Sequence, residues 1–149
     1  MNQLYLILEK TKEVLEADID VNTVTYGDIT QIDLDKQTIY PLSHVMLNTV
    51  TSNEQVLRFN ISIIAMDLVD VTKEEDDGYE RSNEQDVLNT QLAVVNKVIQ
   101  KLRIGNLYRD KYQIEGDVTL EPFTDRFENQ VAGFVATFDI ITDNDVDVC

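Results

Sequence analysis

Two long stretches of alternating apolar and polar residues constrain the fold of this chain most. In Glu54–Val71 the odd-numbered positions from 57 to 65 are apolar, and the even-numbered positions between them are mostly polar. In Gln130–Thr142 the even-numbered positions from 132 to 140 are apolar in the same way. A period of two puts one apolar row on one face of a β-strand. Two such strands need each other's backbone groups and a shared cover for their apolar faces, so we expect them to pair.

The alternation in the first stretch changes near Ile64. Ile64, Met66 and Leu68 are apolar on the face that is polar before them. Either a β-bulge shifts the register at this point, or this end of the strand is buried on both faces. Both interpretations indicate a contact beyond one simple core.

Two helices are expected. Residues 3–17 carry the apolar stripe of an amphipathic helix, with charged residues opposite it. A second helix should begin at Ser82, which forms a capping box with Gln85, and end at Gly105 as its C-cap. Between the central strand and this helix, residues 72–86 hold seven acids against two bases, which predicts a solvated, mobile acidic loop.

Further strands are expected over residues 23–26, 29–34, 43–51 and 112–120. Gly27 and Asp28 suit a tight turn between the first two, Pro41 argues against a central strand around it, and Pro122 should end the strand that begins at Tyr112. Residues 143–149 should fray. The predicted fold is α+β: an antiparallel twisted sheet of about four to six strands with two helices packed on one face, in a single domain over residues 1–149.

The charge balance narrows the choice of partners. Twenty-eight acids against twelve bases give a formal charge of −16, which repels phosphate and disfavours binding to nucleic acid or to an anionic membrane. No apolar run is long enough for a transmembrane helix, and the first residues resemble no signal peptide. The single cysteine, Cys149, has no intrachain partner, which fits synthesis in a reducing compartment.

The sequence nominates no catalytic, cofactor-binding or metal-ligating residue. The single histidine, His44, lies within a predicted strand, where a structural histidine is the better interpretation. The acidic run Asp18–Asn22 lacks the glycine and the glutamate of an EF-hand loop and predicts a solvated turn. No glycine-rich phosphate loop is present, and zinc would need more ligands than one cysteine and one histidine. We therefore expect a protein that is not an enzyme and needs no cofactor.

The order of elements and two local motifs resemble the tail terminator (tail-completion) proteins of tailed bacteriophages and, more loosely, their neck proteins. The first motif comprises Tyr26-Gly27-Asp28, Ile32-Asp33-Leu34, Lys36-Gln37-Thr38, Tyr40-Pro41-Leu42 and His44, and the second is Phe127-Glu128-Asn129-Gln130-Val131-Ala132-Gly133-Phe134. The resemblance implies a virion structural protein, made in the host cytoplasm, that forms a ring between the tail tube and the head connector. Such a ring commonly has six copies, with twelve as the alternative, contacts neighbouring neck and tail proteins and lets genomic DNA pass through.

A closed ring needs a head-to-tail contact between two different patches of one subunit. We expect the contact to join a basic patch to an acidic one, with apolar adhesion beside it. The basic residues are Lys97, Lys101, Arg103, Arg109 and Lys111; the acidic ones are Glu74, Glu75, Asp76 and Asp77; the apolar ones are Ile64, Met66 and Leu68. An ordinary acidic surface explains the same charges. Two other functions stay open, another neck or head-completion ring protein and an acidic DNA-mimic inhibitor.

Overall fold

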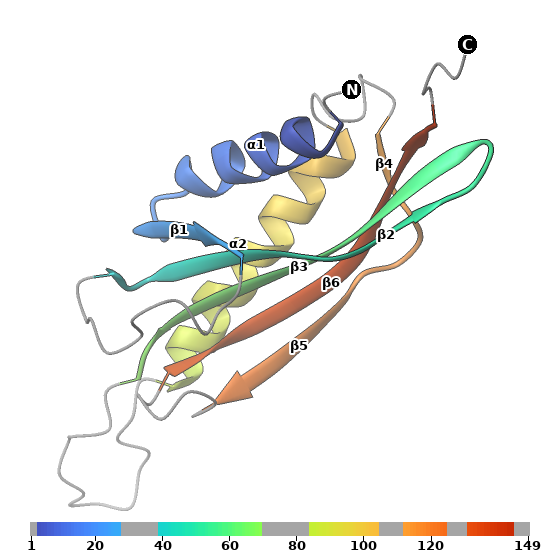
Figure 1. Ribbon diagram of the computed structural model, residues 1–149. Coiled ribbons are helices and arrows are strands. Elements are labelled where there is room, and N and C mark those ends of the chain that lie inside the picture. The colour runs from blue at the N-terminus through green and yellow to red at the C-terminus, as the bar shows by residue number, and fades with distance from the viewer. Residues whose placement is uncertain (1–2, 28–38, 70–83, 105–111, 125–130, 145–149) are drawn as a thin grey trace, which may run out of the picture.

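The computed structural model describes residues 3–27, 39–69, 84–104, 112–124 and 131–144. The fold is α+β, as the sequence predicts: two helices and a six-stranded, mostly antiparallel sheet (Figure 1). The elements run in the order α1 (Gln3–Glu16), β1 (Thr23–Tyr26), β2 (Leu42–Ser52), β3 (Val56–Leu68), α2 (Glu84–Ile104), β4 (Gln113–Ile114), β5 (Thr119–Thr124) and β6 (Val131–Asp143). Several predicted features lie outside the described residues. They are the turn residue Asp28, the strand 29–34, the N-cap Ser82, the C-cap Gly105, most of the acidic loop 72–86 and the end of the tail 143–149.

The predicted pairing of the two long strands is confirmed. β3 and β6 run antiparallel over their whole length, from Val56 opposite Asp143 to Leu68 opposite Val131. The strand order is β1-β2-β3-β6-β4, and β5 also pairs with β6. β3 and β6 therefore form the centre of the sheet, as their alternating patterns require.

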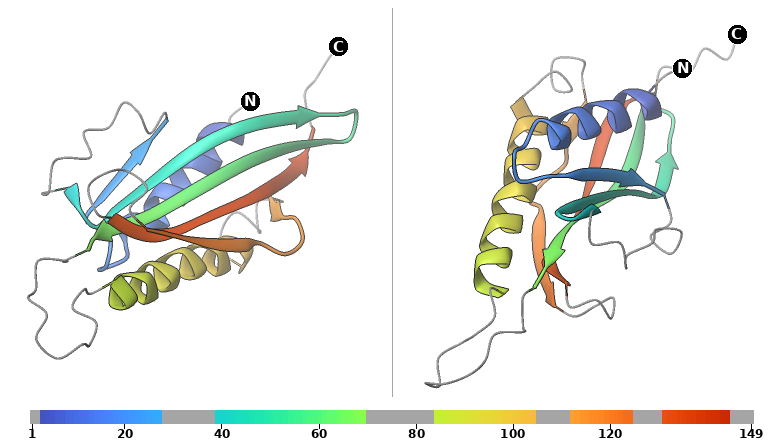
Figure 2. Two further views of the ribbon diagram at one scale, coloured as in Figure 1. Left: turned by 90° about the horizontal axis from the view of Figure 1, so that it is seen from below. Right: turned by 90° about the vertical axis from the view of Figure 1, so that its left-hand side faces the viewer.

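Both helices pack on the same face of the sheet (Figure 2). Their buried residues join the odd-numbered row of β3 and the even-numbered row of β6 in one apolar cluster. On the helices this cluster contains Ile7, Leu15, Val94, Val95, Val98, Ile99 and Leu102; on the sheet it contains Val45, Leu57, Phe59, Ile61, Ile63, Ala65, Ala136, Phe138 and Ile140. Burial of these side chains supplies the main driving force for the fold.

The structure decides between the two interpretations of the change in alternation near Ile64. β3 keeps its register against both neighbours there, so the predicted bulge is wrong at this position and the two-sided burial is confirmed. Residues 61–66 are all buried, and Ile64 and Met66 belong to a second apolar cluster on the face away from the helices. The register shift that does occur lies in β2, between Leu47 and Thr49.

Three details of the sheet differ from the sequence prediction. β1 pairs with β2 in parallel, so the sheet is not wholly antiparallel. The predicted strand 112–120 is divided into β4 and β5, and between them Gly116 has a φ of 67°, a conformation that glycine adopts without strain. Pro122 lies inside β5 instead of ending it. An edge strand tolerates proline because one side of its backbone needs no ladder hydrogen bond.

The carboxyl group of Asp67 lies near the end of β3, where partial burial raises its pKa even though the backbone N–H of Leu68 donates to it at 2.7 Å. A raised pKa means that the folded protein holds this proton more tightly than the unfolded chain does. Stability is therefore lost as the pH rises through the folded-state pKa. We expect Asp67→Asn to raise the melting temperature at pH 7 and to give no gain at pH 3.5. Asp117→Asn, at an exposed position, is the control, and an equal gain for Asp67→Asn at both pH values would contradict this origin.

Candidate assembly surface

Three residues of the predicted basic patch, Lys97, Lys101 and Arg103, lie in α2 among the described residues. Lys97 makes an ion pair with Asp18 of the same chain, with Nζ 3.3 Å from Oδ2. Arg103 donates from Nη2 to the carbonyl oxygen of Gly116 at 2.8 Å. Lys101 is exposed. The other predicted contact residues lie outside the described part of the chain: the basic Arg109 and Lys111 and the acidic Glu74, Glu75, Asp76 and Asp77. Lys97 thus has a partner within its own subunit, and its role in a contact between copies stays a prediction.

Asp18 joins the end of α1 to the middle of α2. Its side chain is 1% exposed. Oδ1 accepts a hydrogen bond from the backbone N–H of Asp20 at 3.0 Å, while Oδ2 faces Lys97 without the alignment of a hydrogen bond. The run Asp18–Asn22 is therefore a turn, as predicted, but its first carboxylate is buried instead of solvated. No group of three His, Cys, Asp or Glu side chains in the described part of the chain is placed to hold a metal ion.

We expect Lys97→Met to lower the free energy of unfolding by about 1–3 kcal/mol, because it leaves the buried Asp18 carboxylate without its counter-charge. Urea denaturation measures the loss. Lys101→Met, one helical turn further along α2, is the matched control and should change stability little. Adding Asp18→Asn to Lys97→Met should recover part of the loss, and a purely additive double mutant would contradict the pairing.

The apolar residues expected to hold copies together are also placed within the subunit. Ile64 is 4% exposed, Met66 is fully buried and Leu68 is partly buried. All three pack in the second apolar cluster, together with Tyr40, Leu42, Phe123 and Val131. Ile64 and Met66 are therefore packed inside the subunit, and only the partly buried Leu68 is accessible to a partner; the role of the three residues between copies stays a prediction.

His44 has the structural role that its sequence position predicts. The ring is fully buried. Nε2 lies 2.6 Å from the carbonyl oxygen of Gly27, and Nδ1 lies 2.7 Å from Oγ1 of Thr25. A carbonyl oxygen can only accept, so Nε2 carries a proton, and in the neutral ring Nδ1 accepts from the Thr25 hydroxyl. His44 therefore links β2 to β1 and the residue after it.

A chain of polar side chains crosses the face opposite the helices. Asn48 donates from Nδ2 to both Asn60 Oδ1 and Ser62 Oγ at 2.8 Å. Asn60 donates to Asp139 Oδ1 at 2.8 Å, and the hydroxyls of Ser62 and Thr137 lie 2.9 Å apart. These cross-strand contacts join β2, β3 and β6. They also hold the side chain of Asn48, which lies at the register shift of β2, against the sheet. These polar groups therefore satisfy one another on this face of the sheet.

An arginine extends this network toward β4. Arg58 Nη2 donates to Glu115 Oε1 at 3.2 Å, and Arg58 Nε lies 2.9 Å from Oε2. Asp139 Oδ2 is further away, 3.9 Å from the same Nε. The three side chains are 33–46% exposed, so solvent screens the charges and each pair stabilises by only about 0–1 kcal/mol. They orient the chain after β4 more than they add stability.

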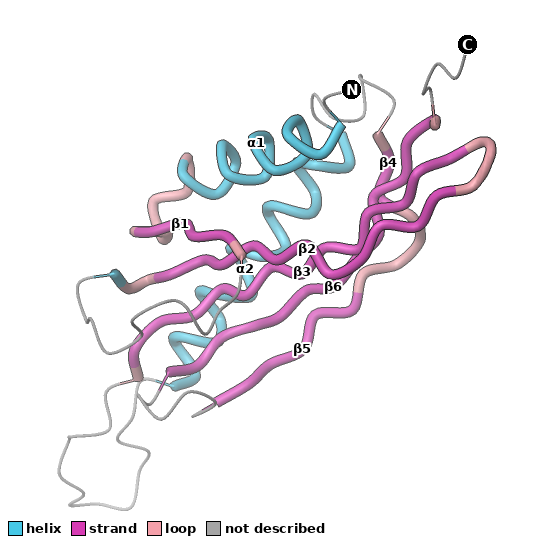
Figure 3. Tube along the Cα trace, viewed as in Figure 1, coloured by secondary structure: helices cyan, strands magenta, loops and turns pink. Residues whose placement is uncertain are grey.

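The free edge of β2 is a surface that the sequence prediction missed. β1 pairs only with Leu42–Val45, and no described strand pairs with residues 46–52 on the side away from β3 (Figure 3). The sequence does carry a signal for this edge. Residues 37–53 contain no Asp, Glu, Lys or Arg, and no other uncharged run of the chain is as long. In a protein of charge −16, this is where a second copy meets least electrostatic repulsion.

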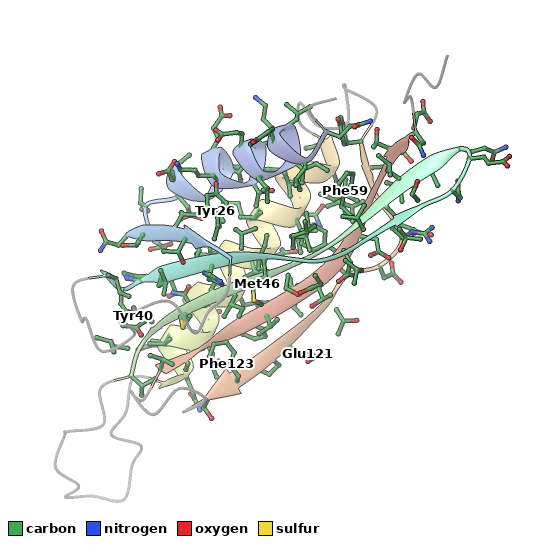
Figure 4. The ribbon with its side chains drawn as sticks, in the orientation of Figure 1. Tyr26, Tyr40, Met46, Phe59, Glu121 and Phe123 are labelled. Carbon is green, nitrogen blue, oxygen red and sulfur yellow. The ribbon has the colours of Figure 1, made fainter. Side chains whose placement is uncertain are left out.

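The opposite edge of the sheet is different. β5 presents Glu121 and Pro122, and both are exposed (Figure 4 labels Glu121). Charges and proline are the usual devices by which an edge strand avoids pairing with another chain. β2 has neither device over residues 46–52. Its edge is therefore the better candidate for a contact between proteins.

Comparison with known proteins adds no relative. No family model matches the chain, and no curated protein sequence is significantly similar to it. Among the described residues, no helix is both long and apolar enough to cross a membrane.

Proposed function

We propose that this protein is a non-enzymatic structural subunit that assembles with copies of itself. By its resemblance to tail terminator proteins, we assign the assembly as a ring at the head–tail junction of a tailed bacteriophage, commonly of six copies. The ring caps the tail tube or joins it to the connector. The observation that supports self-assembly best is the edge of β2 over residues 46–52, which carries no charge and pairs with no other described strand, on a chain of charge −16.

The charge also suits a passage for DNA. A ring built from subunits of this charge repels the phosphate backbone, so DNA can move through it without being held. The proposal assigns no reaction to the protein and no cofactor. His44 is consistent with this, because its ring is buried and bonded to Thr25 and Gly27.

The experiment is to purify the protein and determine its mass by sedimentation velocity, with negative-stain images of the same sample. Closed rings of uniform copy number are expected, and a gel-shift assay should detect no binding to double-stranded DNA at physiological salt. Labelling of virus particles with an antibody to the protein should mark the junction of head and tail. Compact monomers that bind and inhibit a DNA-processing enzyme would support the DNA-mimic function in place of this one.

A further inference from the structure

Two polar side chains are buried in the layer between the helices and the sheet. Gln91 of α2 is 1% exposed, and Ser43 of β2 is fully buried. Within the described part of the chain, Nε2 and Oε1 of Gln91 and Oγ of Ser43 have no hydrogen-bond partner. Buried polar groups are almost always paired in folded proteins, because an unpaired group carries the full cost of leaving water. These three atoms therefore call for a partner that the described residues do not supply.

The register of the sheet places Ser43 on the face that the helices cover. Ser43 lies opposite Ala65 of β3 on one side and opposite Val24 of β1 on the other. Both of these neighbours pack in or against the main apolar cluster, as does Val45, two residues further along β2. Residues two apart in a strand share a face. The Ser43 side chain therefore points into the layer between the sheet and the helices.

The path of α2 places Gln91 at the level of Ala65. At the start of the helix Val87 packs with Ala132 of β6, whose partner in β3 is two residues beyond Ala65. From there α2 runs back along the sheet toward β4 (Figure 1). One helical turn advances about 5.4 Å and two residues of a strand about 6–7 Å. The turn that carries Gln91 therefore lies over the row of Ala65, the row that also contains Ser43.

Short side chains at this level leave room for the amide of Gln91. Ala65 carries only a methyl group, and Ser43 beside it carries only a hydroxymethyl group. Neighbouring strands lie about 4.8 Å apart. The Gln91 amide over Ala65 and the Ser43 hydroxyl on the next strand are therefore within reach of one small bridging molecule.

The donors and acceptors of the three atoms define the chemistry of that molecule. Nε2 of Gln91 only donates and Oε1 only accepts, while the Ser43 hydroxyl can do both. A cation would pair only with the oxygens, and an anion would pair only with the N–H and O–H groups. Water donates and accepts, and a buried water typically makes about three hydrogen bonds to otherwise unpaired polar groups. Water is therefore the ligand that matches this set of atoms.

We propose that a water molecule is held between α2 and the sheet, where it bridges the side-chain amide of Gln91 to the hydroxyl of Ser43. The water accepts from Nε2 and donates to Oε1 of the same amide, and its remaining proton or lone pair is bonded to Oγ of Ser43. It thereby joins the middle layer of α2 to β2. The site lies inside one subunit, so the proposal does not depend on the proposed assembly.

Magnetic relaxation dispersion of the water oxygen nucleus tests the proposal directly. It counts water molecules that stay bound for longer than the protein tumbles, and exchange of hydroxyl protons does not affect it. Gln91→Met keeps the length of the side chain and removes its polar atoms, so it should lose about one long-lived water. Gln100→Met is the matched control, since Gln100 is exposed on the same helix and should keep the wild-type count. Circular dichroism melting checks that each variant is folded.

A double-mutant cycle with Ser43→Ala measures whether the two side chains share the water. Gln91→Met and Ser43→Ala should each lower the folding equilibrium constant by at least about threefold, because the remaining groups lose a hydrogen-bond partner. The double variant should lose at least about threefold less than the product of the two single effects, because the second change removes a group that the first has already left unpaired. Urea denaturation measures all three variants.

A crystal structure of the wild-type protein tests the site without any variant. Its density should show a water within about 3.2 Å of Nε2 or Oε1 of Gln91 and of Oγ of Ser43. Density in which the two side chains bond only to each other would overturn the proposal. So would a Gln91→Met protein that retains the wild-type count of long-lived waters. If both single variants are more stable than the wild type and their effects simply multiply, the groups are buried without a shared partner, and the proposal is again wrong.

Discussion

Gly133→Ala is expected to lower the free energy of unfolding by about 3 kcal/mol, through overpacking against the backbone. Gly133 lies in β6 opposite Met66 of β3. A Cβ atom at this position would lie 1.8 Å from the Ala65 carbonyl oxygen and 2.9 Å from the Met66 Cα. Both atoms belong to the backbone of the neighbouring strand, so no side-chain rotation can relieve the clash. The central pair of the sheet would have to separate locally.

Chemical denaturation with urea measures this loss, and Gly116→Ala provides the comparison. Gly116 has open space around its Cβ position but a φ of +67°, so alanine there should cost only about 1 kcal/mol of backbone strain. The Gly133 variant should also expose the amides of β3 and β6 to faster hydrogen exchange. A loss at Gly133 no larger than that at Gly116 would show that β3 and β6 are further apart than described.

His44→Leu is expected to destabilise the protein by about 3 kcal/mol, because it leaves polar groups of two neighbouring segments without their partner. The Gly27 carbonyl oxygen loses a donor at 2.6 Å, and the Thr25 hydroxyl loses an acceptor at 2.7 Å. Leucine has a side chain of similar bulk, so the loss of stability reports mainly on these two hydrogen bonds. Protection of the β1 amides against exchange should fall more than that of β6.

Thr25→Val is the matched variant for His44, since it removes one of the two bonds and keeps the shape of the side chain. It should cost about 1 kcal/mol. Because the two residues share a bond, the double variant should lose less than the sum of the single losses. A His44→Leu protein as stable as the wild type would mean that the histidine does not hold β1 in place.

The centre of the fold could be predicted from the sequence because its signals are local and repeated. The alternation in β3 and β6 is long enough to define both strands, and pairing them leaves their apolar rows on the same face. The stripes of α1 and α2 are equally regular, so the layer order follows. His44 could be assigned a structural role because no second catalytic group accompanies it.

The remaining features depend on contacts between distant residues. Nothing near Asp18 in the sequence indicates that Lys97 of α2 will lie beside it. The alternation from Tyr112 to Leu120 continues through Gly116, so the break between β4 and β5 has only one glycine as its signal. The parallel pairing of β1 with β2 depends on the path of the chain between these two strands. Each of these is decided by tertiary packing, which outweighs local preference.

The same limit applies to the assembly surface. A count of charges along the sequence directs attention to clusters of charged residues, Lys97 among them, and leads us to expect contacts between copies there. The structure shows a contact of Lys97 that charge counting does not indicate, the ion pair with Asp18 of the same subunit. The more informative pattern is the missing charge along residues 37–53, which becomes meaningful once residues 46–52 of β2 are seen to have no described strand on the side away from β3.

The pairing of β3 with β6 also has a consequence for how fast the chain reaches its native state. The two strands at the middle of the sheet are separated in sequence by α2, β4 and β5, so their ladder closes a long loop. Chains dominated by such remote pairings fold on a scale of about milliseconds to seconds, far slower than helical bundles. During that interval the row Ile61–Met66 is uncovered. A newly made subunit is then most vulnerable to aggregation before its last strand has arrived.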